Sequence, residues 1–281
     1  MELSAYLKNT RISQWWYWVG VCAIASSAFN PEFMIVRVLL VIIGFSFLFA
    51  SVYSLNNTYD QESDRGNHSK LNPVARGSIS FKEGLTESII LGVAGLILLS
   101  LVSIEGLIGG VLLYVLSIVY HIPPLRTKAR PYLDIITITL LYSTPFFIGY
   151  TAINSIDLKG TSFALLFGLL CGSTHPFQTA KDIEEDRRND DITISVLIGV
   201  KKSMLLSLVL LLSTMMYFEL LILAKLLDPK VFFVPLIFIP SLLYYYRVIT
   251  HPSNKKIDNT WNLLRVSGTV GALLPLYLLL A

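Results

Sequence analysis

The sequence predicts an all-α polytopic membrane protein, and three observations lead to this fold class. The chain has 281 residues, of which 54% are hydrophobic and only 15% are charged. A soluble domain of this length cannot bury so much apolar surface. The charged residues fall in short runs that separate apolar segments, most of them long enough to cross a bilayer as helices. We expect nine spans, at residues 14–30, 33–55, 85–104, 106–122, 132–153, 161–180, 203–226, 231–246 and 261–280.

The first span follows a short polar segment, residues 1–13. No convincing small-residue cleavage site follows, so we expect no removable signal peptide. The span opens on the aromatic run Trp15-Trp16-Tyr17-Trp18. Amphipathic aromatic side chains mark the membrane–water interface, and they can also face a substrate. The sequence leaves both interpretations of this run open.

The basic residues predict how the spans are oriented. If the amino terminus and alternate loops lie on one side, most of the 22 lysine and arginine residues lie there, and the opposite side holds Lys159, Lys225 and Lys230. The positive-inside rule makes the basic side cytoplasmic. We therefore expect an integral protein of the cell membrane, with the polar clusters described next facing the cytoplasm.

Two rows of oxygen-bearing side chains end two of the predicted spans. Asn56, Asp60 and Asp64 are spaced four residues apart, and a second row repeats that spacing 126 residues later. On a helix, residues with this spacing share one face. The constant offset indicates a duplicated unit. The second row consists of Asp182, Asp186 and Asp190.

The chemistry of these rows points to a hard cation. Carboxylates this close repel one another and stay ionised together only opposite a positive charge. Oxygen ligands suit Mg²⁺, usually with a phosphate completing its shell. Two such rows brought opposite one another could hold Mg²⁺ ions with a diphosphate between them. The alternative for either row alone is a solvated acidic loop.

A polar loop of more than a dozen residues follows the first row. Loops of that size in a compact fold are usually lids or binding loops. Its basic residues Arg65, Lys70 and Arg76 are candidates to neutralise phosphate. Each of them can equally serve only the charge bias of the membrane surface.

A histidine continues the second row toward the membrane interior. His175 precedes Asp182 by seven residues, so apart from the intervening Pro176 it extends the acidic face inward. A histidine there can accept a proton from a reacting acceptor, or it can hydrogen-bond to a neighbouring helix. With Asp60 and Asp182, it makes up the set of residues that we predict to be catalytic.

Three motifs in this order resemble those of the UbiA-type intramembrane prenyltransferases. In that family, nine helices surround a chamber open to the lipid, and two Asp-rich motifs hold Mg²⁺ and an isoprenyl diphosphate. The resemblance covers nearly the whole chain. The motifs are Asn56-x-x-x-Asp60-x-x-x-Asp64, Tyr120-x-x-Pro123-Pro124-x-Arg126-x-Lys128 and Lys181-Asp182-x-x-x-Asp186-x-x-x-Asp190.

The resemblance implies an activity and roles for individual residues. The activity is Mg²⁺-dependent transfer of an isoprenyl group from its diphosphate to a lipophilic acceptor in the bilayer, with release of diphosphate and no part for nucleic acid. The metal and diphosphate ligands would be Asn56, Asp60, Asp64, Asp182, Asp186 and Asp190. The residues touching the diphosphate region would be Arg65, Tyr120, Arg126 and Lys128, to which we add the basic neighbours Lys70 and Lys181.

The chain departs from the family's usual motif sequence at two places. Asn57 stands where the family often has aspartate, and Asn72-Pro73 stands where Arg-Pro frequently occurs. The aromatic run at the first span and the segment around Asp134 resemble the branch that prenylates carotenoids such as lycopene. Ether-lipid and quinone precursors stay open as acceptors.

We predict one domain over residues 1–281, with pseudo-repeats at about 14–130 and 132–256 and a final helix at 261–280. The alternative from another class is an ion-coupled transporter, which also carries intramembrane acids and internal repeats. The binding groups of a transporter belong near the bilayer midplane. The acids of this chain lie at the predicted cytoplasmic ends of spans, beside basic loops, which favours the prenyltransferase.

Overall fold

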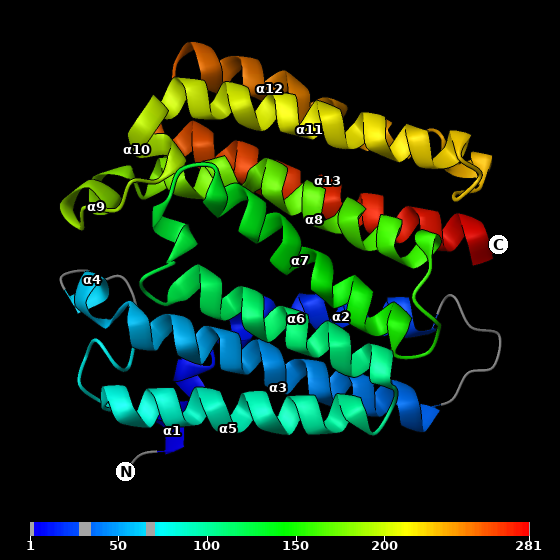
Figure 1. Cartoon of the computed structure of the whole chain (residues 1–281). Coiled ribbons are helices and arrows are strands. Elements are labelled where there is room, and N and C mark those ends of the chain that lie inside the picture. The colour runs from blue at the N-terminus through cyan, green and yellow to red at the C-terminus, as the bar shows by residue number, and fades with distance from the viewer. Residues whose placement is uncertain (1–2, 28–34, 66–70, 281) are drawn as a thin grey trace. The chain divides into compact units, whose positions relative to one another are not determined.

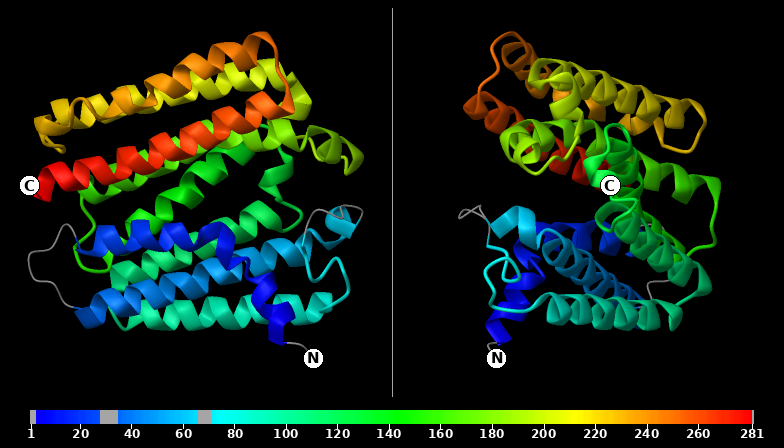
Figure 2. Two further views of the ribbon diagram at one scale, coloured as in Figure 1. Left: turned by 180° about the vertical axis from the view of Figure 1, so that it is seen from behind. Right: turned by 60° about the vertical axis from the view of Figure 1, so that its left-hand side comes forward.

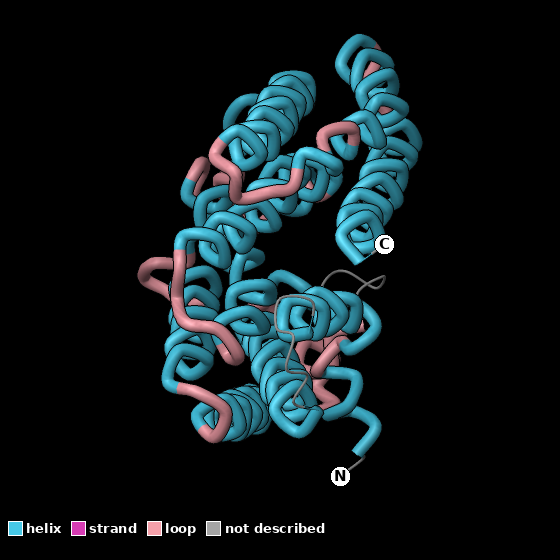
Figure 3. Tube along the Cα trace, turned by 90° about the vertical axis from the view of Figure 1, so that its right-hand side faces the viewer, coloured by secondary structure: helices cyan, strands magenta, loops and turns pink. Residues whose placement is uncertain are grey.

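The structure, a computed structural model, describes residues 3–27, 35–65 and 71–280, and within these ranges it contains helices and loops without strands (Figure 3). The all-α class is therefore confirmed. The elements are α1 Leu3–Asn9, α2 Ile12–Ser27, α3 Ile35–Tyr59, α4 Gln61–Arg65, α5 Phe81–Ser100, α6 Ile104–His121, η1 Thr127–Ala129, α7 Leu133–Thr151, α8 Leu158–Lys181, α9 Ile183–Arg188, α10 Ile194–Ile198, α11 Val200–Leu223, η2 Pro229–Val231, η3 Val234–Phe238, α12 Ile239–Thr250 and α13 Asn254–Leu280.

The chain divides into two compact units, which we describe separately. Unit 1 comprises Met1–Arg126 and Thr144–Ala164, and unit 2 comprises Thr127–Ser143 and Leu165–Ala281. Helices α7 and α8 each contribute residues to both units. The first oxygen-rich row belongs to unit 1 and the second to unit 2.

Six segments of the described chain are long and apolar enough to cross a membrane. Three further spans expected from the sequence correspond to helices α2, α8 and α13, which fall outside this set. Helix α2 has only 16 residues, and α8 carries polar residues such as Thr174, His175 and Gln178. The six segments are Ile35–Tyr59, Phe81–Ser100, Ile104–His121, Leu133–Thr151, Val200–Leu223 and Pro229–Thr250.

In unit 1, α3 and α5 lie side by side because small residues line both helices (Figures 1 and 2). A Cβ atom at Gly95 would lie 2.7 Å from the carbonyl oxygen of Gly44, so the two backbones meet without side chains between them. Further along, the hydroxyl of Ser51 donates to the carbonyl of Ser88 (2.6 Å), and Ser88 donates back to the carbonyl of Ser51 (3.0 Å). Small residues and interhelical hydrogen bonds of this kind hold membrane helices together.

Unit 2 has an apolar core built from α8, α11, α12 and α13, of which α11 and α12 lie side by side (Figure 1). Tyr245 is fully buried there, with its ring edge against Phe177. Its hydroxyl lies 2.9 Å from that of Ser207, which also donates to the carbonyl of Ser173. Phe177 and Ala180 in this core anchor the carboxyl-terminal end of α8 directly before Asp182.

The second row does not form one continuous helical face, contrary to the expectation from its spacing. Helix α8 ends at Lys181, Asp182 lies in a bend, and α9 runs only from Ile183 to Arg188. The amide of Asp186 still donates to the carbonyl of Asp182 (2.8 Å), which preserves one helical step. Asp190 lies beyond the helix with a φ of 57°, so its spacing in sequence does not place it on the face shared by the other two.

Candidate active site: two oxygen-rich rows

The first row keeps the helical spacing that the sequence predicts. Beyond the end of α3, the amide of Asp60 donates to the carbonyl of Asn56 (2.9 Å), and the amide of Asp64 donates to that of Asp60 (2.8 Å). These bonds carry the i to i−4 pattern through the junction into α4. The three side chains therefore follow one another along a nearly continuous helix.

Asn56 connects the row to two other parts of unit 1. Its Nδ2 donates to Oδ2 of Asp60 (2.8 Å) and lies 3.2 Å from Nδ1 of His121, while its Oδ1 accepts from the guanidinium of Arg11 (2.9 Å). An arginine can only donate, so the oxygen of the amide must face Arg11 and the nitrogen must face His121. Nδ1 of His121 therefore faces the N–H side of the amide.

Asp64 is buried and held by the loop that follows it. Its Oδ2 accepts from Nδ2 of Asn72 (2.9 Å), which also donates to the carbonyl of Asn57 (2.8 Å). The side-chain oxygen of Asn72 in turn accepts from the amides of Val74 and Ala75. At the place where the family frequently has arginine, this chain thus has an amide that ties the loop to the first row.

The second row is more open to solvent than the first. Asp182 and Asp190 are exposed, and Asp186 is partly buried between α9 and the following loop. Burial raises the pKa of Asp186 to about 6, and the neighbouring carboxylates of Asp182, Asp191 and Glu185 act in the same direction. A hydrogen bond from Thr193 (2.8 Å) acts against this rise. A cation at this row would favour the ionised form of Asp186.

Two basic residues predicted to contact the diphosphate form local ion pairs instead of standing alone. Arg65 pairs with Glu62 at 3.1 Å on the surface of α4. Lys181 lies 2.6 Å from Asp258 of α13, and both side chains are about half exposed. Lys70, predicted for the same role, lies outside the described residues.

The middle motif spans the boundary between the two units. Tyr120 is the last residue but one of α6 in unit 1, with its ring centroid 4.9 Å from that of His121, and Arg126 is the last residue of that stretch of unit 1. Lys128 lies in η1, which belongs to unit 2. Tyr120 therefore lies next to a residue that contacts the first row.

His175 has a buried acidic neighbour in unit 2. Its Nε2 lies 3.4 Å from Oδ2 of Asp134 at the start of α7, and both side chains are buried. The distance is longer than a well-formed hydrogen bond, and within the described residues neither atom has another hydrogen-bond partner. The other carboxylate oxygen of Asp134 accepts from the amide of Ile135 (2.7 Å). The carboxylate is thus positioned to orient the imidazole.

The oxygen atoms of the two rows suit Mg²⁺ better than they suit a metal ion whose ligands all come from the protein. Among the described residues, no three histidine, cysteine, aspartate or glutamate side chains gather as a metal-binding cluster. Mg²⁺ usually takes one or two carboxylates and completes its octahedron with water and substrate phosphate. Asp60, with Asn56 beside it, offers that kind of partial shell in unit 1, and the Asp182–Asp186 pair offers it in unit 2.

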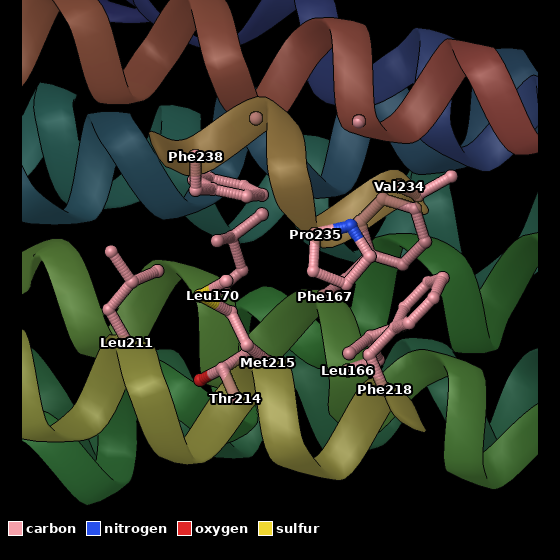
Figure 4. A pocket seen from close by; sticks show the side chains of 12 residues that line it. Leu166, Phe167, Leu170, Leu211, Thr214, Met215, Phe218, Val234, Pro235 and Phe238 are labelled. Carbon is pink, nitrogen blue, oxygen red and sulfur yellow. The ribbon is translucent and has the colours of Figure 1, made fainter. Parts of the chain in front are cut away.

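Unit 2 also contains an apolar cavity of about 70 Å³ between α8, α11, η3 and α13 (Figure 4). Leu166 and Leu170 of α8, Met215 and Phe218 of α11, and Phe238 line it. Among the described residues, no titratable side chain lines it, and the hydroxyl of Thr214 in its wall donates to the carbonyl of Leu210 (2.8 Å). The described lining is apolar and suits a hydrocarbon chain.

Sequence reasoning missed Arg11, His121 and Asn72, the residues that contact the first row from outside it. In the sequence, Arg11 is only one of the basic residues on the amino-terminal side, and His121 occupies an unspecified position of the middle motif. The departure of Asn72 from the family wording was a signal, because an asparagine beside a proline suits a loop that must bond to a neighbouring carboxylate.

The fold and the two rows define a class: an all-α integral membrane protein with two aspartate-rich segments that each follow a long helix. The chain belongs to the UbiA prenyltransferase family, whose sequence profile matches residues 14–268. The ion-coupled transporter gains no support from this match.

Curated relatives carry two kinds of name. A digeranylgeranylglyceryl phosphate synthase of Methanosphaera stadtmanae is 28% identical over 56% of each chain, and one of Thermococcus sibiricus is 25% identical over 76% of this chain and 74% of that protein. A lycopene elongase/hydratase of Haloarcula japonica is 29% identical over 53% of this chain and 50% of that protein. Apart from the Thermococcus sibiricus match, the chain spans about half the length of these relatives.

Solved structures share the fold over almost the entire chain. A UbiA homolog from Archaeoglobus fulgidus bound to DMAPP and Mg²⁺ superposes with a TM-score of 0.80 at 20% identity, covering 98% of this chain and 97% of that one. A UbiA homolog from Aeropyrum pernix K1 in its apo form gives a TM-score of 0.71 at 17% identity, covering 93% of this chain and 96% of that one. At these identities the likeness establishes the fold.

Proposed function

We propose that the chain transfers an isoprenyl group from an isoprenyl diphosphate to a lipophilic acceptor in the membrane, with Mg²⁺ as cofactor and diphosphate as the leaving product. The observation that carries this proposal is the first row, where Asn56 and Asp60 stand together at the end of a membrane-spanning helix. Membership of the UbiA prenyltransferase family supports it, as do relatives whose structures are bound to DMAPP or GPP with Mg²⁺.

The proposed roles follow from what each side chain can do. When bound, Mg²⁺ offsets the charge that develops on the leaving diphosphate. Asp60 and Asp182 are the principal carboxylate ligands, and Asn56, Asp64, Asp186 and Asp190 support them. Of these, Asp64 is bonded to Asn72, so its contribution is to fix the end of the row. The apolar surroundings keep water from the allylic carbon once its bond to oxygen breaks.

His175 is the proposed proton acceptor. As the acceptor substrate forms its new carbon–carbon or carbon–oxygen bond, it must release a proton, and a neutral imidazole can take it. Asp134, 3.4 Å away, would orient the ring and stabilise the imidazolium. The burial of both groups supports a functional role for the pair, because burying a carboxylate without a close partner costs free energy.

For the acceptor, the relatives favour lipids over water-soluble molecules. Their names point to an ether-lipid precursor or a carotenoid, and a quinone precursor remains the third candidate. We propose no nucleic-acid partner. The cell membrane is the proposed location, with both rows facing the cytoplasm, because basic residues concentrate on that side.

Nine spans and an internal repeat belong to the same proposal. Adding 126 to the bounds of α3, α5 and α6 gives 161–185, 207–226 and 230–247, close to α8, to α11, and to the segment from η2 to α12. One domain, with pseudo-repeats at about 14–130 and 132–256, accounts for these pairs. In this arrangement α2, α8 and α13 complete the six spans to nine.

The test is turnover by the purified full chain in detergent. Dimethylallyl, farnesyl and geranylgeranyl diphosphates are each supplied with a lipid extract, and released pyrophosphate and prenylated products are measured by mass spectrometry. We expect turnover with Mg²⁺ that EDTA abolishes. Asp60→Asn should lose most of its turnover, while Glu62→Gln, an exposed acid two residues away, should behave as wild type. A folded wild-type chain that releases no pyrophosphate from any donor would refute the proposal.

A further inference from the structure

The amino-terminal helix α1 brings an arginine onto the first row. The guanidinium of Arg11 donates to Oδ1 of Asn56 (2.9 Å), although the two residues are 45 positions apart in the sequence. We propose that Arg11 binds a phosphate oxygen of the diphosphate substrate, and that α1 serves to hold it there. This inference rests on the proposed function.

Asn9, the last residue of α1 and two positions before Arg11, is fixed in place by buried hydrogen bonds. Helix α1 packs against α3 and α5, and Asn9 at its end is fully buried. Nδ2 of Asn9 donates to Ser54 (2.8 Å) and to Glu87 (2.7 Å), while its backbone carbonyl and Oδ1 both accept from Nδ2 of Asn57 (3.0 Å each). Every polar group of the Asn9 side chain is thus bonded to a membrane-spanning helix.

The backbone between α1 and α2 is held in an unfavourable conformation at Arg11. Arg11 has a φ of 50°, in the left-handed region that a residue with a long side chain seldom adopts. Trp15 is also buried, and its indole nitrogen donates to the carbonyl of Thr10 (2.6 Å), the residue directly before Arg11. Such strain persists only where the surroundings enforce it, and it concentrates at functional sites.

The charge of Arg11 has no acidic counterpart of its own. Its partner Asn56 is neutral, and among the described residues no carboxylate forms an ion pair with its guanidinium. A fixed cation beside a row that binds Mg²⁺ would repel the metal unless an anion lay between them. A diphosphate is that anion, and the planar fork of a guanidinium matches two phosphate oxygens.

The competing explanation is that Arg11 only orients the amide of Asn56. Arg11→Gln separates the two roles, because a glutamine amide can still donate to Asn56 but carries no charge. Lys8→Gln is the matched control, since Lys8 is an exposed cation of α1 three residues before Arg11. The measurement is the affinity of the purified full chain for inorganic pyrophosphate in saturating Mg²⁺, by isothermal titration calorimetry.

We expect Arg11→Gln to bind pyrophosphate about ten- to a hundredfold more weakly than wild type, the range for losing a charged hydrogen bond, and Lys8→Gln to bind normally. Equal affinities for wild type and Arg11→Gln, or equal losses in both variants, would overturn the inference and leave the proposed function standing. A wild-type chain without affinity for pyrophosphate would instead count against the proposed function.

A measurement on the unmodified chain guards against a variant that fails to fold. Phenylglyoxal modifies exposed arginines, and peptide mass spectrometry reports each site. We expect pyrophosphate with Mg²⁺ to slow modification of Arg11 at least severalfold and to leave Arg247, an exposed arginine of α12, unchanged. Equal modification of Arg11 with and without pyrophosphate would contradict the proposed contact.

Discussion

The two oxygen-rich rows share a spacing in the sequence, but their own units hold them differently. In unit 1, Asn56 is bonded to Arg11 and lies against His121, and Asp64 is buried against Asn72. In unit 2, Asp182 and Asp190 are exposed, and Thr193 holds Asp186 through one hydrogen bond. The first row is therefore the more preorganised, and the second depends more on what binds to it.

This difference has a structural cause in the helices that carry the rows. Helix α3 ends at Tyr59 and α8 at Lys181, and in both rows i to i−4 bonds run through the junction into the next short helix. The rows differ at their last member, because the amide of Asp64 still donates to the carbonyl of Asp60, whereas Asp190 has left the helical conformation. Equal spacing in sequence thus produced a row that stays helical in one unit and a row whose last member leaves the helix in the other.

The largest expected effect is the loss of activity when one carboxylate is removed from either row. We predict that Asp60→Ala and Asp182→Ala each lower turnover by about 10² to 10³, since each removes a charged group that stabilises the leaving diphosphate. Turnover is measured with the donor that the wild type uses. Glu184→Ala, which removes an exposed acid paired with Arg187, is the control and should retain activity. Near-normal turnover in Asp182→Ala would restrict the chemistry to the first row.

The support beneath the first row is tested by filling the contact between α3 and α5. We predict that Gly95→Ala destabilises the protein by about 1 to 3 kcal/mol, because its Cβ would press on the backbone of Gly44. Gly20→Ala, at a helical glycine with nothing within 4 Å of the new Cβ, should be neutral or slightly stabilising. Thermal unfolding in detergent compares the two. Equal melting temperatures would show that this close approach is not what holds α3 in place.

The hydrogen bonds around the rows provide a direct comparison between them. Asn72→Ala removes the side chain that bonds to Asp64, the carbonyl of Asn57 and two loop amides, so we expect a loss of about 1 to 3 kcal/mol. Thr193→Val removes one bond from Asp186, for which about 0.5 to 1.5 kcal/mol is expected. Both are measured by thermal unfolding without Mg²⁺. If Thr193→Val cost more than Asn72→Ala, the second row would be the better supported of the two.

Local spacing predicted much of this molecule. The all-α class, the positions of the long helices and the composition of both rows follow from hydrophobic segments and from residues four positions apart. The contact of Asn56 with Arg11 joins residues 45 positions apart, and that with His121 joins residues 65 apart. No periodicity records such distant pairs, because they depend on how the helices pack.

The bend in the second row could not be predicted from the sequence, for a different reason. A run of acids and arginines such as residues 184–188 favours a helix as readily as a loop. Where the helix stops depends on tertiary contacts, among them the bonds that Asp186 accepts from Thr193 and from the amide of Asp191. Spacing alone cannot distinguish a continuous face from one that ends at Asp186.

The smallest expected effect concerns Lys181, which was predicted to contact the diphosphate and which forms an ion pair with Asp258 at 2.6 Å. Because both side chains are about half exposed, we expect a double-mutant cycle with Lys181→Met and Asp258→Asn to give a coupling of only about 0.2 to 1 kcal/mol in stability. Pyrophosphate binding in Mg²⁺ then separates structure from function. If Lys181 binds the substrate, Lys181→Met should weaken binding, while Asp258→Asn, which releases the lysine, should not. Equal weakening in both variants would mean that the ion pair itself shapes the second row and that Lys181 has no direct role in binding the diphosphate.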